Sequence, residues 1–273
     1  MSERSGDSVR VRIEVSSGDA SALSGYRPYG AGTLTRPGVA GSQRTVLVPG
    51  AHAPGSDIEV AAADCVMLPS ALDPAKAVLV PAVAASLALW ETLHLELGDA
   101  AVWTSGGPLS ALVGQASLWR GACPGIELGA ESSAGLDPRQ VEHVELSDTE
   151  TAAARLATLV SARPGFAAVD LSGRADVIDV LLEVIPRWGR LLLAGPPGTP
   201  VTIDYYRNVH RKGIVLASTV LEPSCVFDSQ SDVRSQVVRA YAVLGNPRMA
   251  AQCNALLGVV PSVQVRAGLS VAG

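Results

Sequence analysis

The chain has 273 residues, of which 48% are hydrophobic and 17% charged, and its formal net charge at pH 7 is −5. Its mean hydropathy of +0.28 supplies apolar material for a buried core and is not typical of a disordered chain. The acidic balance and the scattered arginines argue against nucleic-acid binding. Since no apolar run reaches the ~18 residues of a membrane span and the first residues lack a signal-peptide core, we expect a soluble, cytoplasmic protein without a membrane partner.

The first part of the chain predicts a small β unit that is rich in loops. Residues 9–15 alternate apolar and charged side chains, which is typical of a strand with one face on a core and one in water. Residues 16–45 are rich in Ser, Gly, Pro and Tyr with no sustained period, and therefore predict a loop. Short strands are expected over 44–48, 57–60 and 65–68, with Pro-Gly turns between them.

From residue 73 onward, helices and strands alternate. Asp73 and Pro74 suit the N-cap and first position of a helix, and a longer helix is expected over 82–97, ending at Gly98. Strands are expected over 100–104, 126–128, 141–146, 166–171, 189–195 and 213–219, with helices over 109–120, 149–161 and 174–185. Such alternation implies parallel strands joined by right-handed crossovers. The fold class is therefore α/β, with a Rossmann-type doubly wound parallel sheet.

Residues 103–110 lie where the first strand of this sheet meets its helix. A dinucleotide fold needs small residues at this turn, because the chain bends tightly, its backbone approaches the pyrophosphate, and the helix packs closely on the strand. The exposed N–H groups and the helix dipole then hold the phosphates. Against Gly-x-Gly-x-x-Gly, the turn keeps Gly107 and carries Ser105 and Ser110 in place of the other two glycines. A glycine-rich turn that binds no ligand is the alternative interpretation.

The ribose end of the pattern leaves the cofactor open. An acidic side chain about 20 residues past the turn would bind the 2′-hydroxyl of NAD, and the count from Ser110 ends near Gly129. Glu131 supplies the carboxylate if the strand end is shifted by two residues. Ser132 and Ser133 are able to bind the 2′-phosphate of NADP, although no arginine stands beside them. NAD, NADP and no dinucleotide at all therefore stay open.

Six segments, in order along the chain, resemble a known superfamily. They are residues 58–69, which end in Leu-Pro, residues 98–103, Gly107-Pro108-Leu109, and residues 141–144, 168–173 and 187–195. Together they resemble the medium-chain dehydrogenase/reductase superfamily, to which the alcohol dehydrogenases belong, over about residues 58–222. The resemblance implies cofactor contacts from Ser105, Gly106, Gly107, Pro108, Leu109, Glu131, Ser132, Leu171, Ser172, Gly195 and Pro196.

The resemblance also implies a division of the chain. Residues 1–81 would form a reduced, β-rich substrate domain, a remnant of the superfamily's GroES-like domain. Residues 82–225 would form the Rossmann nucleotide-binding domain, and 226–273 a helical segment that packs on the N-terminal unit, with helices over 231–244 and 248–257. Relatives pair the last strand of the sheet across a two-fold axis, so we expect a homodimer through residues 214–219, whose edge would otherwise leave backbone groups unpaired.

The zinc ligands of the superfamily are missing. Ser16 stands where zinc members carry a cysteine, in Val15-Ser16-Ser17-Gly18-Asp19, and the Gly-His-Glu segment is absent. His52 is the sole histidine among the first 90 residues. Because a zinc site needs Cys, His or carboxylate ligands that converge, we expect no zinc.

Without zinc, a hydride-transfer enzyme polarises its carbonyl by hydrogen bonding or acts on an activated alkene. Ser16, Tyr26 and Tyr29 are the candidate donors and Asp19 a candidate supporting acid, although each also fits an ordinary role on the surface or in a loop. The sequence favours a zinc-independent NAD(P)-dependent oxidoreductase of a small organic carbonyl or activated alkene in specialised biosynthesis. The alternative is a non-redox lyase or cyclase, or an accessory protein, that kept the scaffold and lost the cofactor.

Overall fold

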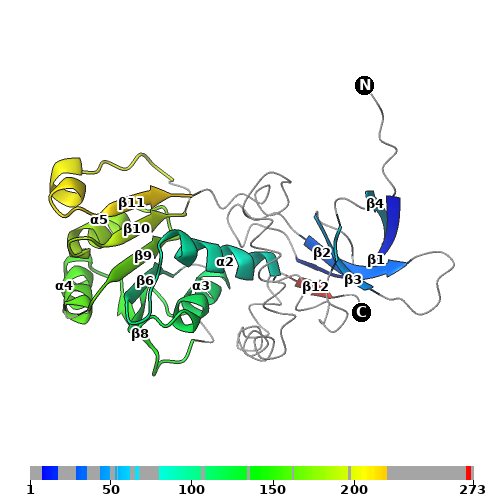
Figure 1. Cartoon of the computed structure of the whole chain (residues 1–273), viewed down its shortest axis with the longest axis horizontal. Coiled ribbons are helices and arrows are strands. Elements are labelled where there is room, and N and C mark those ends of the chain that lie inside the picture. The colour runs from blue at the N-terminus through cyan, green and yellow to red at the C-terminus, as the bar shows by residue number, and fades with distance from the viewer. Residues whose placement is uncertain are drawn as a thin grey trace. The chain divides into compact units, whose positions relative to one another are not determined.

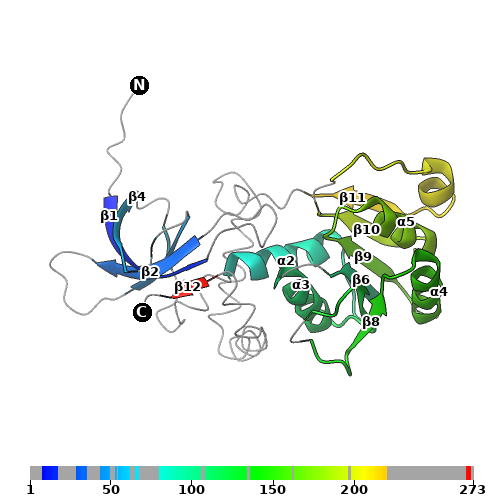
Figure 2. The same ribbon diagram turned by 180° about the vertical axis from the view of Figure 1, so that it is seen from behind.

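The computed structural model describes residues 8–17, 29–35, 44–49, 53, 55–61, 65–67, 80–105, 108–133, 136–161, 163–195, 198–219 and 269–271. By its internal contacts the chain divides into two units, Met1–Ala84 with Glu222–Gly273, and Ala85–Leu221. Figures 1 and 2 show the elements of each unit from opposite sides. In the described part of the chain, no helix combines the length and apolar character that a membrane crossing needs.

The first unit contains an antiparallel sheet built around β1 (Ser8–Ser17). Val11 and Ile13 of β1 are fully buried while Arg10 and Arg12 are exposed, which confirms over residues 10–13 the alternation expected over 9–15. Val46 and Val48 of the third strand complete the small core. The other strands are β2 (Tyr29–Thr35), β3 (Arg44–Pro49), β4 (Asp57–Ala61), β5 (Val66–Met67) and β12 (Leu269–Val271), in the order β12-β1-β2-β3-β5 with β4 also on β1.

The prediction of a loop over residues 16–45 is wrong for Tyr29–Thr35, which form β2. Its sequence, Tyr-Gly-Ala-Gly-Thr-Leu-Thr, has two glycines and no alternation of large apolar side chains, so it lacks the ordinary signal of a strand. β2 is hydrogen-bonded to β1 on one side and to β3 on the other. Pairing with both neighbours therefore imposes the extended conformation that the local sequence does not favour.

The end of the chain returns to this sheet as a strand. Val271 lies opposite Val15, and Leu269 opposite Ser17, so β12 pairs antiparallel with the end of β1. Sequence analysis did not foresee this strand. The helices expected over 231–244 and 248–257, and the helix start at Asp73-Pro74, lie outside the described residues.

The second unit is the doubly wound parallel sheet that the sequence predicts. Every neighbouring pair of its strands is parallel. The strands β6 (Ala100–Thr104), β7 (Gly125–Gly129), β8 (Val141–Glu145), β9 (Phe166–Asp170), β10 (Arg190–Leu193) and β11 (Val215–Ser218) lie in the order β11-β10-β9-β6-β7-β8. Counted from β8, this is the 3-2-1-4-5-6 order of dinucleotide-binding folds.

Helices cover both faces of this sheet (Figure 1). Ala100, Val102, Ile126 and Leu128 point from the strands into a core shared with α4 and α5. Residues 101, 103, 125, 127 and 129 point to the opposite face by the period of two. The helices are α2 (Val80–Thr92), α3 (Pro108–Trp119), α4 (Thr149–Val160), α5 (Ala175–Val184) and the short π-helix η3 (Tyr205–His210).

The helix ahead of β6 is shorter than expected, since α2 ends at Thr92 and not at residue 97. His94 adopts a positive φ of 49°, which leaves the α-helical region. Asp99, almost fully buried, then accepts a hydrogen bond from the Glu96 N–H at 3.1 Å and forms an ion pair with Arg190 of β10. This carboxylate joins the start of β6 to β10 and fixes the turn that ends the helix.

Trp103 fills the space between the sheet and α3. The side chain is fully buried on β6, and a Cβ at Gly114 of α3 would lie 2.5 Å from its Cζ2 atom. A Cβ at Gly125 of β7 would lie 3.3 Å from the same ring. The two glycines therefore make room for one large aromatic side chain, and Trp90 of α2 locks the helix pair by donating from Nε1 to the Val113 carbonyl at 2.8 Å.

We predict that Gly114→Ala lowers the free energy of unfolding by about 1–3 kcal/mol, the usual cost of overpacking a core. Alanine would stabilise an unconstrained helix by ~1 kcal/mol relative to glycine, so a loss identifies the collision with Trp103. Urea unfolding measures the change, with Gly198→Ala as the control because a Cβ at that position meets nothing within 4 Å. A variant as stable as the parent would show that Trp103 moves aside without cost.

Candidate functional site

The candidate site lies at the carboxyl edge of the second unit's sheet, between β6 and β9. These strands are neighbours, with Trp103 opposite Val169, yet the chain leaves β6 toward β7 on one side and returns to β9 on the other. Ligands of open α/β sheets bind in the crevice at such a switch point. Ser105 follows β6 and Leu171 follows β9, so the structure brings together two of the residues expected to bind a cofactor.

Asp170, the last residue of β9, fixes the turn on one side of the switch point. Its fully buried carboxylate accepts hydrogen bonds from the Ser172 N–H at 2.9 Å, the Ser172 hydroxyl at 2.6 Å and the Gly173 N–H at 3.0 Å. The Thr104 hydroxyl of β6 donates to it at 3.3 Å and accepts from the Leu171 N–H at 2.7 Å. Its partners are donors of its own turn and Thr104 of the neighbouring strand, so Asp170 orders the turn.

Gly195, expected to bind the cofactor, packs its backbone against this same turn. A Cβ there would overlap the Leu171 carbonyl group and the Gly173 nitrogen. The N–H of Gly195 donates to the Asp170 carbonyl at 2.9 Å. Only glycine allows this approach, so the residue is explained by packing of the loops after β9 and β10. Pro196 lies outside the described residues.

The turn after β6 differs from the dinucleotide fingerprint in a way that the structure explains. The Ser105 side chain lies over Gly129, the last residue of β7: a Cβ at Gly129 would overlap the Ser105 hydroxyl and lie 2.6 Å from its Cβ. Serine at the first fingerprint position therefore requires glycine at the strand end where an acid was expected. Pro108 begins α3, Leu109 and Ser110 are buried, and Gly106 and Gly107 lie outside the described residues.

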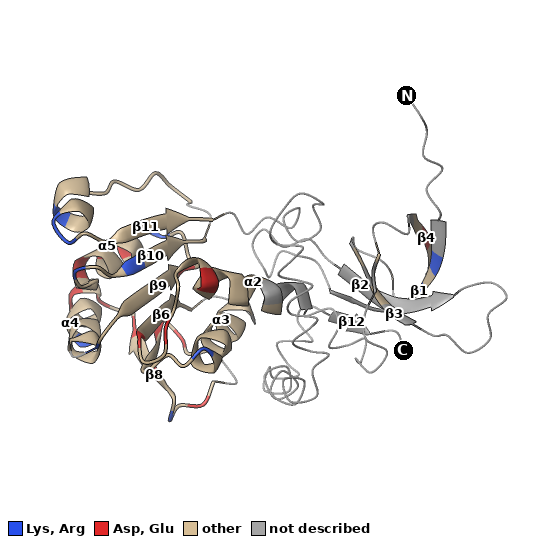
Figure 3. Ribbon diagram, in the orientation of Figure 1, with Lys and Arg blue, Asp and Glu red and all other residues tan. Residues whose placement is uncertain are grey.

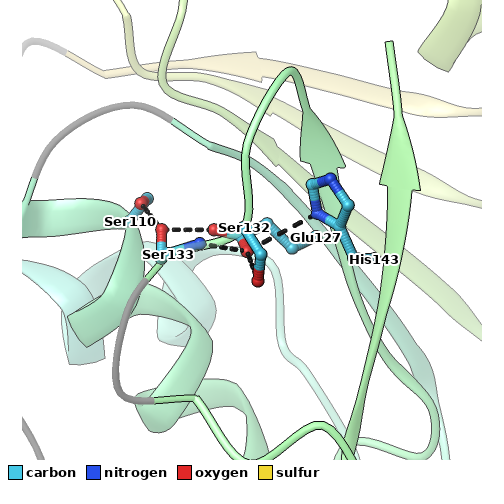
Figure 4. A network of polar contacts seen from close by, with 5 residues as sticks. All are labelled: Ser110, Glu127, Ser132, Ser133 and His143. Atoms are coloured by element: carbon cyan, nitrogen blue, oxygen red, sulfur yellow. Dashed lines mark hydrogen bonds and ion pairs between the residues drawn. The ribbon is translucent and has the colours of Figure 1, made fainter.

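Sequence analysis missed Glu127, a fully buried carboxylate in the middle of β7 (Figure 4). It accepts a hydrogen bond from the Ser133 N–H at 2.8 Å, a short one from the Ser133 hydroxyl, and one from the Ser132 hydroxyl at 3.3 Å. The Ser133 hydroxyl also lies 2.6 Å from that of Ser110 in α3. The charged residue between Ile126 and Leu128 in a buried strand was the signal that could have revealed it. The Ser132 hydroxyl thus contacts Glu127, although Ser132 and Glu131 are both exposed residues.

The candidate substrate-site residues lie in the first unit. For Ser16 and Tyr29 the structure describes the backbone but not the side chain. Ser16 of β1 lies opposite Gly30 of β2, so the register brings Tyr29 to within one residue of the partner of Ser16. Asp19 and Tyr26 lie outside the described residues. Within the described ranges, no three His, Cys, Asp or Glu side chains gather as metal ligands would.

A groove of about 560 Å³ lies between α4 and α5, and none of the turn residues described above lines it. Alanine side chains of α4 line one wall, and Asp176, Asp179 and Glu183 of α5 line the other. Nothing in this lining is a buried polar group without a partner, so the groove is not assigned to a ligand.

Comparison with known proteins finds solved structures of similar fold, whereas the comparisons by sequence find no match. No protein-family model and no curated protein matches the sequence. Among solved structures, 2R,3R-butanediol dehydrogenase from Bacillus subtilis matches with a TM-score of 0.67 and 14% identity, covering 100% of this chain and 95% of its own. Galactitol-1-phosphate dehydrogenase from Escherichia coli matches with a TM-score of 0.66 and 13% identity, covering 91% and 84%.

A third solved structure carries a bound dinucleotide. It is a zinc-binding dehydrogenase of Sinorhizobium meliloti, bound to NADP, with a TM-score of 0.64 and 15% identity, covering 88% of this chain and 83% of its own. The chain therefore has the fold of these dehydrogenase structures over most of its length, as the sequence resemblance implied. At this identity the likeness establishes the fold alone.

We predict that Gly129→Ala destabilises the protein, because its Cβ would overlap Ser105, and that Ser105→Gly in the same chain removes most of the loss. The expected coupling between the two positions is about 0.5–3 kcal/mol, the range for residues in contact. Urea unfolding of the parent, both single variants and the double variant measures it. Additive effects would contradict the described contact between these residues.

Proposed function

We propose that the chain is an NAD(P)-dependent oxidoreductase that acts on a small organic carbonyl compound or an activated alkene. The observation that supports this most strongly is the switch point between β6 and β9 in a parallel sheet of dinucleotide-binding order. The similarity to solved dehydrogenase structures over most of the chain adds to it. The enzyme would belong to specialised biosynthesis and act in the cytoplasm.

The residues at this edge fit a dinucleotide in three groups. At the start of α3, Gly106, Gly107 and Leu109 would hold the diphosphate through backbone N–H groups and the positive end of the helix dipole. Ser105 and Pro108 would contact it without such a donor, since the Ser105 N–H donates to the Leu128 carbonyl at 2.8 Å and proline has none. Leu171 and Ser172, on the turn fixed by Asp170, would line the side of β9, and Gly195 with Pro196 the side of β10. The bound dinucleotide supplies the hydride, while these residues orient it and exclude water from it.

The substrate side of the proposal depends on the first unit, residues 1–81, acting with the segment 226–273. We propose that no zinc takes part, since Ser16 stands where relatives in zinc-dependent branches carry a cysteine. A hydroxyl of Ser16, Tyr26 or Tyr29 would then donate a hydrogen bond to the substrate oxygen, and Asp19 would support that donor. The backbone register that places Tyr29 beside the partner of Ser16 favours these two.

A second candidate function is a non-redox enzyme, such as a lyase or cyclase, or an accessory protein that kept the scaffold. Ser105 favours it. The serine side chain reaches over the end of β7, into space that a glycine fingerprint leaves open for the adenosine half of a dinucleotide. Binding of a dinucleotide separates the two functions.

We also propose a homodimer through the edge of β11. Val215 on this strand is 56% exposed, and three exposed aromatic side chains, Trp188, Tyr205 and Tyr206, belong to the segments before and after β10. Among the described strands β11 is the last in the sheet order, so its outer side would offer backbone groups for pairing. An exposed edge with apolar side chains is usually covered or paired.

The proposed activity predicts saturable binding of NADH or NADPH below millimolar concentration, followed by the change in nucleotide fluorescence. Reduced dinucleotide should be consumed in the presence of a member of a panel of aldehydes, ketones, quinones and enones. Activity should persist after treatment with a chelator, with no stoichiometric zinc by elemental analysis. Absence of binding of either dinucleotide at millimolar concentration would favour the non-redox function, and activity that is lost with zinc would contradict the proposed chemistry.

The proposed dimer predicts a solution mass of twice the chain mass of 28.0 kDa by light scattering. Val215→Lys should shift the mass toward that of one chain, because a lysine on an edge strand opposes pairing. Thr158→Lys, at an exposed position of α4, is the control and should leave the mass unchanged. A monomeric parent protein would remove this part of the proposal.

A further inference from the structure

The geometry points to NADH, and not NADPH, as the dinucleotide of this protein, with buried Glu127 as the residue that positions the selecting loop. This inference rests on the proposed oxidoreductase function and specifies its cofactor. The loop in question, residues 130–133, is called the β7 loop because it directly follows β7. An acid at this place in a dinucleotide fold binds the ribose 2′-hydroxyl, where NADP carries its phosphate.

Glu127 folds the β7 loop back onto the sheet. The carboxylate lies in a central strand at 0% exposure, where a charge without partners would be strongly destabilising. It is satisfied by the backbone N–H and hydroxyl of Ser133 and by the hydroxyl of Ser132. Figure 4 shows these groups pointing inward from the loop toward Glu127. The loop conformation is therefore a condition for burying this carboxylate.

The hydroxyls that a 2′-phosphate would need are already engaged. Ser132 and Ser133 both donate to Glu127, and the oxygen atoms of Ser133 and Ser110 lie 2.6 Å apart. His143 of β8 places its Nδ1 atom 3.8 Å from the Glu127 carboxylate, so it faces the same acid from the other side. A 2′-phosphate at this loop would find these hydroxyls already donating to Glu127. It would also lie close to the charge of the Glu127 carboxylate.

The rest of this edge offers a phosphate little positive charge. In the residues that directly follow the strands, 105–107, 130–133, 146–148, 171–174, 194–198 and 219, Arg174 is the one Lys or Arg. Its guanidinium is held by Asp176, with Nη2 at 2.6 Å and Nε at 3.1 Å from the two carboxylate oxygens. This hydrogen bond raises the pKa of Arg174 and lowers that of Asp176, so a phosphate that binds Arg174 would compete with the carboxylate of Asp176.

An unphosphorylated ribose fits the same loop. Glu131 is exposed on the β7 loop, two residues past the last residue of the strand, and carboxylate oxygens accept hydrogen bonds from ribose hydroxyls. The contact between the Ser133 and Ser110 hydroxyls ties the loop to the first turn of α3. Glu127 thus acts as a positioning residue: it holds the loop through Ser133, and the loop presents Glu131.

Binding to the parent protein tests the cofactor first. Dissociation constants for NADH and NADPH are measured by nucleotide fluorescence, and ADP and 2′,5′-ADP are then compared as competitors, since they differ only in the 2′-phosphate. We expect NADH to bind at least about tenfold more tightly than NADPH, and ADP to compete better than 2′,5′-ADP by a similar factor. Equal or tighter binding of NADPH would overturn the inference and leave the oxidoreductase function standing, whereas absence of binding of both would overturn the function as well.

The role of Glu127 is tested by Glu127→Gln, which keeps the side-chain size and removes the charge. The readout is the ratio of the NADPH and NADH dissociation constants, because general loosening of the protein would weaken both and leave the ratio unchanged. We expect the ratio to fall severalfold. Glu142→Gln is the matched control, since Glu142 of β8 is half-exposed and paired with Arg155, and it should keep the parent ratio.

Ser133→Ala provides a second variant in case Glu127→Gln does not fold. It removes the hydroxyl that joins Glu127 to Ser110 and keeps the backbone hydrogen bond to the carboxylate. We expect a smaller fall in the same ratio. An unchanged ratio in a folded Glu127→Gln or Ser133→Ala variant would overturn the assignment of Glu127.

Discussion

A carboxylate inside a parallel sheet must be satisfied by hydrogen-bond donors, and the candidate site of this protein depends on that requirement. Asp170 and Glu127 are both fully buried, on strands that flank β6. Each is satisfied mainly by the residues that follow its own strand, Ser172 and Gly173 in one case and Ser132 and Ser133 in the other. The conformations of the two loops that face the switch point are therefore consequences of burying these two acids.

Two glycines at this edge of the sheet allow neighbouring segments of the chain to approach each other closely. Gly195 allows the loop after β10 to touch the turn after β9, and Gly129 allows Ser105 to cover the end of β7. The first arrangement fits any dinucleotide-binding sheet, whereas the second departs from the fingerprint. The same edge thus carries both the strongest support for a redox cofactor and the observation that favours the non-redox alternative. The redox function and the non-redox alternative therefore differ in what serine at position 105 and glycine at position 129 mean for the space at the end of β7.

The sequence predicted the second unit well because short strands alternate regularly with helices, and β6, β7 and β9 are buried along their whole length. All six parallel strands were expected within a few residues of their observed bounds. The cap of α4 was not predicted: the Asp148 carboxylate accepts from the Thr151 N–H at 2.8 Å, which lowers the pKa of Asp148. β2 could not be predicted, because its glycines carry no strand signal and its conformation comes from two neighbours distant in sequence. β12 likewise forms through pairing with β1 at the opposite end of the chain.

The candidate site was predictable in place but not in detail. The alternation of strands and helices predicted the doubly wound sheet, and the turn after β6 lies at its carboxyl edge as expected. The bond between Thr104 and Asp170 and the inward turn of Ser133 depend on side chains brought together by the sheet, with sequence separations of 66 and 6 residues. Residue spacing does not report such contacts. The contact of the Ser132 hydroxyl with Glu127, at 3.3 Å, could not be predicted for the same reason.

Hydrogen–deuterium exchange of the parent protein with and without NADH tests the central claim most directly, since it reports where a dinucleotide lies without any assay of catalysis. The account predicts slower amide exchange at the start of α3, in residues 130–133 and in residues 171–173, with no change in the groove between α4 and α5. Protection confined to that groove or to the first unit, or no protection at all under saturating NADH, would contradict it.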